Sequence, residues 1–401
     1  MASSWTPSGV GRRIAAYRTQ RGITQAVFAG LMGKSLSWVR QVEQGTLHVE
    51  KLSLIIDAAD ILRCKVEDLV GIRVGFAAGN GSVPQAAAAV RGAVMTWTLP
   101  DHDPVPIGDL QQRVGGAWGT WHGSRHSYTD VGRLLPELVL DARHAHRVAD
   151  DPREAAGVLS NVYHLARLWL KKVGDYDLAT LCSDRAVTLA READDPVMLA
   201  LSAWSLTGVL NAAGHPEEGE HVATEAIHIL GGVLPDGPPR LLGLYGQLHL
   251  VRSISQARSG QEGAAWGSWD EGERVARRLG PDWVEPVTCF CAANVDVHAV
   301  AIPAELGQAI QTIEAAQRLD VSACPSVERR SRYCIDVARG YVGQHDDVAA
   351  VHMLLRAEQE SPEELLYSGV CAEMLRELLV RNHAAVRDEL HGLSTRVGVL
   401  G

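Results

Sequence analysis

Apolar residues recur at three- and four-residue spacing along most of this chain, a pattern that predicts helices. In the clearest example, within residues 49–62, one apolar face is formed by Leu52, Ile55, Ile56, Ala59 and Leu62. Beyond residue 84, helical patterns of Ala, Leu, Arg and Glu are separated by Pro or Gly. Alternating apolar and polar residues, which half-buried strands require, are nearly absent. The chain is therefore expected to be all-α.

Two short helices are expected on either side of Gly33. Thr24 is a suitable N-cap for the first helix because its hydroxyl can accept a hydrogen bond from an unpaired backbone amide. Ser35 caps the second helix, in which Val39 and Val42 are three residues apart and share one buried face. The opposite, solvated face of this helix carries Ser37, Arg40, Gln41 and Gln44. Two helices around a glycine turn have the layout of a helix-turn-helix.

Charge distinguishes a DNA-binding module from an ordinary helical hairpin, which occurs by chance in all-α proteins. Residues 10–45 contain one acidic residue, Glu43, and six basic residues, Arg12, Arg13, Arg18, Arg21, Lys34 and Arg40. This segment has an excess of five positive charges, although the whole chain has a net charge of −10. A basic segment on an acidic protein is expected where a module contacts DNA phosphates, so the charge favours DNA binding.

The segment resembles the xenobiotic-response-element family of bacterial and phage repressors. The resemblance covers about residues 10–71. It rests on the run Gly22-Ile23-Thr24-Gln25, on the small turn residue, and on the run from Val39 to Gly45, where Glu43 precedes a polar residue and a glycine. It implies a five-helix domain with helices at about residues 10–21, 24–32, 35–44, 49–62 and 66–69.

The resemblance also implies roles for individual residues. Gln25 and Gln44 are expected to contact phosphates. Ser37, Arg40 and Gln41 are expected to face base edges in the major groove, where Arg suits guanine and Gln suits adenine. The full set of expected DNA contacts is Thr24, Gln25, Lys34, Ser35, Ser37, Trp38, Arg40, Gln41 and Gln44. Arg18 and Glu43 match an ion pair that ties the first helix to the recognition helix in relatives. Leu36 and Trp38 depart from the family pattern, which has small or polar side chains there.

The composition changes after residue 71, which indicates a second domain. Gly, Pro, Asn and Ser are concentrated in residues 72–84 and predict a linker. The expected organisation is a flexible N-terminus at 1–9, a DNA-binding domain at 10–71, the linker at 72–84 and a helical domain at 85–401. Several prolines interrupt residues 85–125, which are expected to form two helices before the rest of the helical domain.

Pairs of small residues seven positions apart recur in the helical domain. The pairs are Ala179 and Ala186, Gly219 and Ala226, Ala265 and Gly272, Ala309 and Ala316, and Ala350 and Ala357. Their first members are 40, 46, 44 and 41 residues apart, and each pair lies on one helical face that a neighbouring helix can approach closely. Five residues before each pair, a turn between two helices is expected at Gly174, Gly214, Gly260, Ala304 and His345. The pattern resembles the tetratricopeptide repeat and implies a TPR-like α-solenoid.

A stack of such helix pairs has a concave inner surface built mainly from the first helix of each pair. The repeat register places nine residues on or near this surface as candidate effector contacts: Asn161, His164, Trp204, Asn211, Gln247, Asn294, His298, Arg332 and Arg339. Asn can clamp a peptide backbone, and Arg can hold a carboxylate. The large aromatic residues Trp169, Trp266, Trp269 and Trp283 are assigned to packing between helices.

The sequence offers little support for catalysis. It has no glycine-rich phosphate loop, no GxSxG elbow and no HExxH motif. The closely spaced histidines are interpreted as surface residues: His122 with His126, and His144 with His146. The seven cysteines form no CxxC pair, which favours free buried thiols, and the group of Cys289, Cys291 and His298 only partly matches a metal-ligand spacing. We expect no enzymatic activity, no cofactor and no metal.

No run of eighteen apolar residues and no signal peptide is found, so a cytoplasmic protein without membrane association is expected. The chain resembles bacterial regulators that join a repressor-type head to a TPR-like body, including peptide-pheromone receptors. This resemblance implies a transcriptional regulator that binds a pseudo-palindromic operator in double-stranded DNA as a homodimer and senses a peptide or small-molecule effector. The alternative is an interaction scaffold whose solenoid binds a partner protein and whose head recruits it to DNA.

Overall fold

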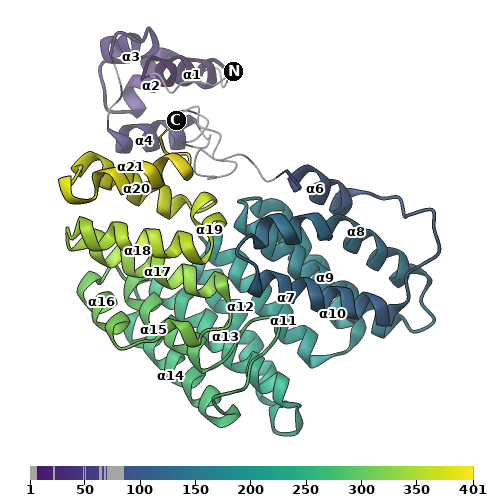
Figure 1. Cartoon of the computed structure of the whole chain (residues 1–401). Helices are drawn as coiled ribbons and strands as arrows, with labels where there is room; N and C mark the ends of the chain where they lie inside the picture. The colour runs from purple at the N-terminus through teal and green to yellow at the C-terminus, as the bar shows by residue number, and fades with distance from the viewer. Residues whose placement is uncertain are drawn as a thin grey trace. The chain divides into compact units, whose positions relative to one another are not determined.

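The chain divides into two units, Met1–Phe76 and Ala77–Gly401 (Figure 1). The computed structural model describes residues 7–20, 23–47, 49, 51–62, 66, 69 and 85–400. The linker expected at 72–84 lies outside these residues, as do most of the expected N-terminal segment and half of the fifth helix expected at 66–69. No strand occurs in the described parts of either unit, which confirms the all-α prediction there.

The first unit contains the expected helix-turn-helix. Its described helices are α1 (Pro7–Gln20), α2 (Gln25–Leu31), α3 (Leu36–Glu43) and α4 (Leu52–Leu62), so α1 begins three residues earlier than expected and α4 three residues later. Thr24 Oγ1 accepts a hydrogen bond from Val27 N at 3.3 Å, and Ser35 Oγ accepts one from Trp38 N at 3.1 Å, which confirms both predicted N-caps. Gly33 has a φ of 61°, the left-handed conformation that the turn requires.

A close approach of α1 to α3 organises the core of this unit. Phe28, Val39 and Val42 are each 1% exposed and pack with Ile14 of α1. A Cβ atom added to Gly11 would lie 1.8 Å from the carbonyl oxygen of Val42. The two helix backbones can therefore be this close only because residue 11 has no side chain.

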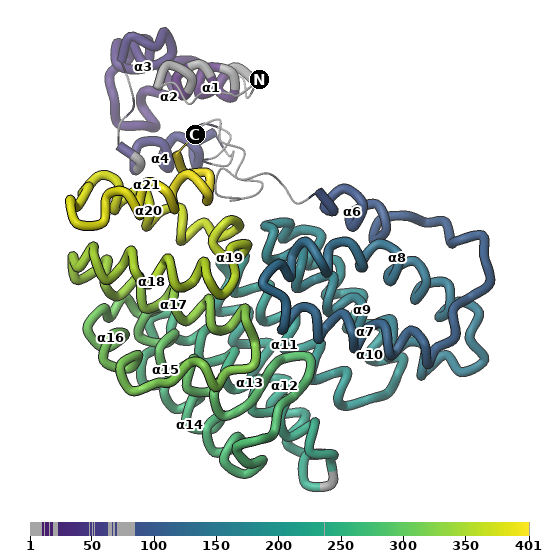
Figure 2. The backbone as a smooth tube through the Cα atoms, in the orientation of Figure 1, coloured from purple at the N-terminus to yellow at the C-terminus, as the bar shows by residue number. Residues whose placement is uncertain are grey.

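The second unit begins with α6 (Ala87–Met95) and α7 (Ile107–Gly123), the two helices expected before the rest of the helical domain. The helices that follow are α8 (Ser127–Val148), α9 (Pro152–Lys172), α10 (Tyr176–Ala193), α11 (Pro196–Ala212), α12 (Pro216–Gly231), α13 (Pro239–Arg258), α14 (Glu262–Leu279), α15 (Ala292–Glu305), α16 (Ala309–Gln317), α17 (Val327–Gly343), α18 (Asp347–Glu360), α19 (Pro362–Leu366), α20 (Gly369–Arg381) and α21 (Arg387–Arg396). Figure 2 shows consecutive antiparallel helix pairs stacked side by side, as in an α-solenoid.

The pairs of small residues lie where helices pack most closely. Ala179, Ala265 and Ala350 are fully buried. A Cβ on Gly219 would lie 2.9 Å from Asn211 Oδ1, and a Cβ on Gly272 would lie 2.7 Å from Leu250 Cδ2. Small side chains at these positions therefore let the two helices of a pair pack against each other, as the repeat pattern predicts.

Glycines in the left-handed conformation form most of the turns within the pairs. Gly174, Gly214 and Gly260 have φ values of 84°, 87° and 73°, and His345 adopts a φ of 58°, so four of the five predicted turn positions are confirmed. The prediction for Ala304 is wrong, because α15 continues to Glu305 and Gly307, with a φ of 72°, makes the turn.

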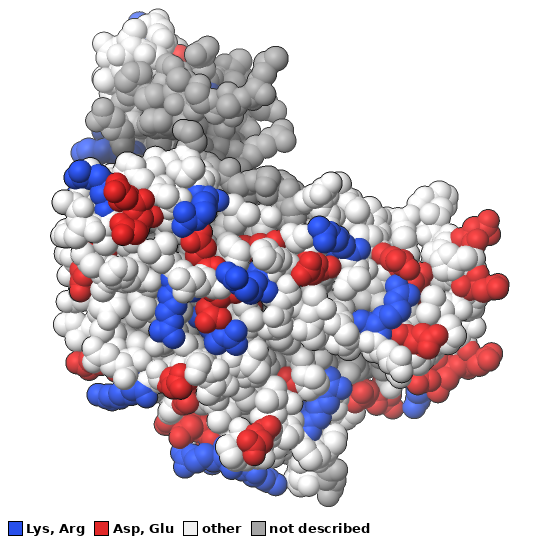
Figure 3. All heavy atoms as spheres, viewed as in Figure 1, with Lys and Arg blue, Asp and Glu red and all other residues white. Residues whose placement is uncertain are grey.

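The interior of the second unit is built from aliphatic and aromatic side chains. Trp169 is fully buried and its Nε1 donates to the carbonyl of Tyr128 at 2.8 Å, while Trp266 packs edge to face against Trp269. The six cysteines in the described residues are free and buried. None of the described helices has the length and hydropathy needed to cross a membrane. Acidic and basic side chains are interspersed over the visible face of this unit (Figure 3).

We expect Gly11→Ala to destabilise the first unit by about 3 kcal/mol, because the added methyl group overpacks the contact between α1 and α3. Hydrogen exchange of the full-length protein, read on peptides from α1 and α3, measures this loss as faster exchange. Gly30→Ala is the matched control, since residue 30 is an exposed position in α2 with no atom within 4 Å of the added Cβ. Equal exchange in the two variants would contradict the close approach.

Candidate functional site

The outer face of α3 presents a row of exposed polar side chains. Val39 and Val42 point into the core, and the opposite face carries Ser37, Arg40, Gln41 and Gln44, all of which are exposed. The spacing of these four residues keeps them on adjacent turns of one helix. They offer guanidinium and amide groups, which form bidentate hydrogen bonds with guanine and adenine edges.

An ion pair between α1 and α3 fixes the position of this face. Arg18 Nε and Nη2 donate to the two carboxylate oxygens of Glu43 at 2.6 and 3.0 Å, and both side chains are largely buried. Hydrogen bonding to Glu43 raises the pKa of Arg18. The ion pair that the family resemblance implied is therefore confirmed. Gln25 Nε2 also donates to Glu43, at 2.7 Å, so the amide nitrogen expected near a phosphate is bonded within the unit.

The remaining predicted DNA contacts surround the start of α3. Thr24, Lys34 and Ser35 are exposed. Trp38 is half-buried, and the Lys34 ammonium lies 5.9 Å from the centre of its ring, within the range of a cation–π interaction. The predicted set, apart from Gln25 and Trp38, is thus exposed, and its contact with DNA stays a prediction.

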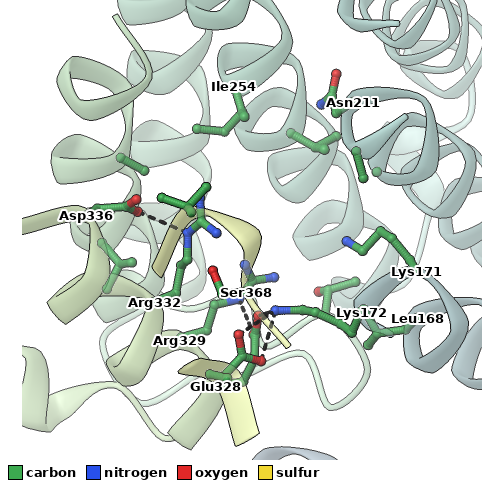
Figure 4. A pocket seen from close by; sticks show the side chains of 18 of the residues that line it. Leu168, Lys171, Lys172, Asn211, Ile254, Glu328, Arg329, Arg332, Asp336 and Ser368 are labelled. Carbon is green, nitrogen blue, oxygen red and sulfur yellow. Dashed lines mark hydrogen bonds and ion pairs between the residues drawn. The ribbon is translucent and has the colours of Figure 1, made fainter. Parts of the chain in front are cut away.

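The second unit encloses a cavity of about 430 Å³. Most of its lining comes from the first helix of each pair, namely α9, α11, α13, α15 and α17, with further residues from α7, α8, α19 and α20. On α9 the lining residues are Arg167, Leu168, Lys171 and Lys172, one helical turn apart. Figure 4 shows charged side chains of α9 and α17 in this lining, among them Lys171, Lys172, Glu328 and Arg332.

Early and late helices of the unit bind each other beside the cavity. Lys172 of α9 lies 2.5 Å from Glu328 of α17 and 3.0 Å from Glu364 of α19. Tyr128 Oη donates to Glu364 at 2.7 Å, and Thr129 Oγ1 donates to Glu363 at 2.5 Å. We refer to Lys172, Glu328 and Glu364 as the closing contact. It links helices more than 150 residues apart and turns the solenoid back on itself.

His122 takes part in the same closure, so its interpretation as a surface residue is wrong. Its ring nitrogens hydrogen-bond with Ser326 Oγ at 3.0 Å and with the carbonyl of Val287 at 3.1 Å. Burial lowers the pKa of His122, which favours the neutral ring. His126, in contrast, is exposed as expected.

Six of the nine predicted effector contacts line the cavity: Trp204, Asn211, Gln247, His298, Arg332 and Arg339. They come from α11, α13, α15 and α17, in agreement with an inner surface built from the first helices. The structure therefore brings together residues that lie up to 135 positions apart in the sequence, from Trp204 to Arg339. Their contact with an effector stays a prediction.

The other three predicted contacts do not line the cavity, because neighbouring helices cover them. Asn161 Oδ1 accepts from Trp118 Nε1 of α7 at 3.0 Å. His164 is fully buried and lies 3.3 Å from the hydroxyl of Ser202 of α11. Burial lowers the pKa of His164 to about 3. Asn294 is fully buried and donates to Gln247 at 3.5 Å.

Carboxylates inside the cavity hold several of its basic residues. Glu305 lies 3.0 Å from Arg258, 3.4 Å from Arg332 and 3.6 Å from Arg339. Asp336 lies 3.4 Å from both Arg332 and Arg339. Burial opposes the ionisation of Glu305, but the three arginines outweigh it and lower the pKa of Glu305 to about 2.

Sequence reasoning missed five basic residues that line the cavity, Arg167, Lys171, Lys172, Arg258 and Arg329. The sequence did contain a signal for Arg167 and Lys171. Both stand in the otherwise apolar stretch 165–171 of α9, where Arg and Lys at i and i+4 share a face with buried residues. A charged residue in the middle of a buried helix is unusual, and it points to an interior polar site.

The cysteine group does not form with His298 as the spacing implied. The Cys289 thiol instead lies beside the thiols of Cys291 and Cys324, and hydrogen bonding with both raises its pKa. His298 Nδ1 is 2.8 Å from the carbonyl of Asn294, and its ring lines the cavity. In the described part of the chain, no group of three His, Cys, Asp or Glu side chains has the arrangement of a metal site.

Comparisons with known proteins identify the first unit. A family model described as a helix-turn-helix domain matches residues 10–70. Over 59 residues the chain is 39% identical to the uncharacterized HTH-type transcriptional regulator YazB of Bacillus subtilis (strain 168). This match spans 15% of the chain and 84% of YazB.

Solved structures share only distant similarity with the chain. BtubC (BKLC) from P. vanneervenii has a TM-score of 0.38 at 16% identity, over 63% of this chain and 90% of that one. Bacillus thuringiensis PlcR in complex with the peptide PapR7 and DNA has a TM-score of 0.33 at 11% identity, and the match covers 88% of this chain and 99% of PlcR. A Rap protein complexed with Competence and Sporulation Factor has a TM-score of 0.43 at 12% identity, and the match covers 73% of this chain and 92% of the Rap protein. Similarity at this level assigns no feature to this chain.

We expect Lys172→Met to destabilise the second unit by about 3 kcal/mol, because it leaves Glu328 and Glu364 buried without their shared cation. Urea unfolding of the full-length protein measures the loss, and small-angle scattering should show a larger radius of gyration as the solenoid opens. Lys171→Met is the matched control, since the neighbouring lysine has no ion pair among the described residues. Equal destabilisation by both variants would contradict the closing contact.

Stability should fall as the pH decreases from 6.5 to 4, partly because of His298. Burial and the nearby Arg329 lower the pKa of His298 to about 4 from an ordinary value of 6.5. Between pH 6.5 and pH 4 the unfolded chain therefore binds more protons than the folded protein. The neutral His298 ring makes its full contribution to the free energy of unfolding above pH 6.5, and this contribution is lost as the pH falls toward 4. The expected change is about 3 kcal/mol. His298→Asn should reduce the pH slope of thermal unfolding, whereas replacement of the exposed His126 should not; an unchanged slope in His298→Asn would refute this assignment.

Proposed function

We propose that this chain, which belongs to the family of helix-turn-helix, DNA-binding transcriptional regulators, binds one operator sequence as a homodimer and responds to an effector held in the cavity of its solenoid. The observation that carries the proposal is the exposed polar face of α3, held in place by the Arg18–Glu43 pair. A recognition helix needs such side chains at its surface and a rigid support beneath them.

The expected contacts divide into two groups. Ser37, Arg40 and Gln41 are candidates for base edges, where bidentate hydrogen bonds confer specificity. Lys34, Gln44 and the exposed N-cap residues Thr24 and Ser35 are candidates for phosphates, which position the protein without reading the sequence. Gln25 supports Glu43 through one N–H of its amide, and the second N–H is a candidate for a phosphate.

The small size of one helix-turn-helix unit supports dimerisation. A single recognition helix covers one half-site, and regulators with this motif bind two half-sites about one helical turn apart, ~34–36 Å. Two copies of this chain related by a two-fold axis would therefore read a pseudo-palindrome.

The cavity supports the effector role. It lies inside a solenoid whose early and late helices meet only through side-chain contacts, so a ligand in the cavity can favour either the closed or an open arrangement. An effector shifts this equilibrium only if it binds the two arrangements with different affinity. A change in curvature would then alter how the two heads of the dimer reach the operator.

Selection of bound sequences from a random DNA pool, with the purified full-length protein at two salt concentrations, tests the DNA-binding part of the proposal. Recovery of a palindrome with half-site centres about 10 base pairs apart is the expected result. Sequence-independent binding that weakens with salt would overturn operator recognition by the protein alone. A stable co-purified protein together with no response to small ligands would instead favour the interaction scaffold.

Arg40→Ala should weaken binding to the selected operator by about 1–3 kcal/mol and relax the preference at one base pair, because the guanidinium would no longer contact a guanine edge. Fluorescence anisotropy with the operator and with single-base variants measures both effects. Arg133→Ala is the control, since Arg133 is an exposed arginine of α8 in the second unit. Unchanged operator affinity in Arg40→Ala would show that another face of α3 reads the bases.

A further inference from the structure

The cavity of the second unit contains more positive than negative side chains. Its lining has seven Lys and Arg residues, which are Arg167, Lys171, Lys172, Arg258, Arg329, Arg332 and Arg339. It has four Asp and Glu residues, which are Glu305, Glu328, Asp336 and Glu364. Three positive charges are therefore left without a matching carboxylate in a largely buried space, where unpaired charge is costly.

Two of the three excess charges lie on neighbouring residues of α9, Arg167 and Lys171. Glu305 and Asp336 bind Arg258, Arg332 and Arg339, and Glu328 and Glu364 bind Lys172. Arg167 and Lys171 have no ion pair among the described residues, and Arg329 shares Glu328 with Lys172; we call Arg167, Lys171 and Arg329 the cationic cluster. Lys171 has no ion pair among the described residues, and Figure 4 shows its ammonium group extending into the cavity with no interaction drawn to it. Arg329 lies 3.4 Å from Glu328, which already binds Lys172.

The charges of Arg167 and Lys171 are unfavourable in their surroundings, whereas Glu328 beside Arg329 raises the pKa of Arg329. Arg167 is 1% exposed, and its guanidinium stacks on Trp204 at 4.8 Å from the ring centre. Burial lowers the pKa of Arg167 to about 9, with a further contribution from the charge of Arg329. Burial, Arg167 and Lys172 lower the pKa of Lys171 well below its ordinary value. An anion between these side chains would remove this cost.

Unused hydrogen-bond donors point to the same ligand chemistry. Arg167 Nε and Nη2 and Asn211 Nδ2 are buried and have no hydrogen-bond partner, and Arg329 Nε has only its ion-pair contact with Glu328 at 3.4 Å. All four atoms are donors on residues that line the cavity. Asn211 Oδ1 accepts from Ser255 at 2.9 Å, which orients the amide so that its nitrogen stays available. The site therefore fits a group that only accepts hydrogen bonds.

We propose that the cavity binds a small molecule through a phosphate group held by Arg167, Lys171 and Arg329. A carboxylate would balance one positive charge, whereas a phosphate monoester carries about −1.5 to −2 and presents three acceptor oxygens. The inference rests on the proposed effector function and specifies its ligand. The cavity is larger than a phosphate group, and Val251, Ile254 and Val297 line it as well, so the rest of the ligand is expected to include an apolar part.

Isothermal titration calorimetry of the full-length protein with pyrophosphate and with inorganic phosphate, at constant ionic strength, tests this site. Both ions should bind, and Arg167→Gln, Lys171→Met and Arg329→Gln should each weaken binding at least tenfold. Lys171→Met should fold at least as stably as the parent, because it removes an unpaired cation, and this separates loss of binding from loss of structure. Arg147→Gln is the control, since Arg147 is an exposed arginine outside the cavity.

Three outcomes would overturn the proposal: no binding of either ion, equal binding by the parent and by all three cluster variants, or equally tight binding of succinate, which would identify a carboxylate site instead. Operator affinity measured in parallel distinguishes this failure from failure of the proposed function. If a peptide without phosphate changes operator affinity while pyrophosphate does not bind, the effector function stands and the phosphate site does not. If pyrophosphate binds through the cluster and operator affinity is unchanged under all ligands, the phosphate site stands and the effector function does not.

Discussion

The solenoid of this protein depends on one ion-pair network between its early and late helices. Lys172 of α9 lies between Glu328 of α17 and Glu364 of α19, and hydrogen bonds from Tyr128 and Thr129 to the acidic residues of α19 extend the same contact. Stacked helix pairs otherwise contact only their neighbours, so such an array has no intrinsic reason to close. The closing contact joins early and late helices of the array, and its three residues line the cavity between them.

Closure of the solenoid also brings the charged side chains of the cavity close to one another. When the first helices of successive pairs face one another across a small space, their basic residues approach, and the four carboxylates balance some of them. Within the cationic cluster, Arg167 and Lys171 have no carboxylate partner among the described residues. A ligand that neutralises the cationic cluster would bind the closed arrangement more tightly than an open one, because opening separates the cations and weakens their combined attraction for the ligand. This difference in affinity is what an effector needs in order to shift a conformational equilibrium.

The first unit follows a different principle, since its functional surface is set by contacts between adjacent helices. Gly11 lets α1 approach α3, and the Arg18–Glu43 pair fixes the rotation of α3, so that Arg40 and Gln41 face solvent. These contacts join residues less than 35 positions apart and belong to a motif with characteristic spacing. For this reason the N-caps could be predicted to the residue, the starts of α1 and α4 to within three residues, and the ion pair from the family resemblance.

The sequence by itself determined the elements: helix positions from apolar spacing, caps at Thr24 and Ser35, turns at Gly174, Gly214 and Gly260, and the close helix contacts at the paired small residues. Each of these depends on neighbours within a few residues, where periodicity and conformational preference are sufficient. Only the tertiary structure decided that His164 is covered by α11 while Arg167, one turn later, reaches the cavity, and that Lys172 meets Glu328 156 residues away. These outcomes depend on the small rotation between successive helix pairs summed over the whole solenoid, a quantity that no local pattern encodes.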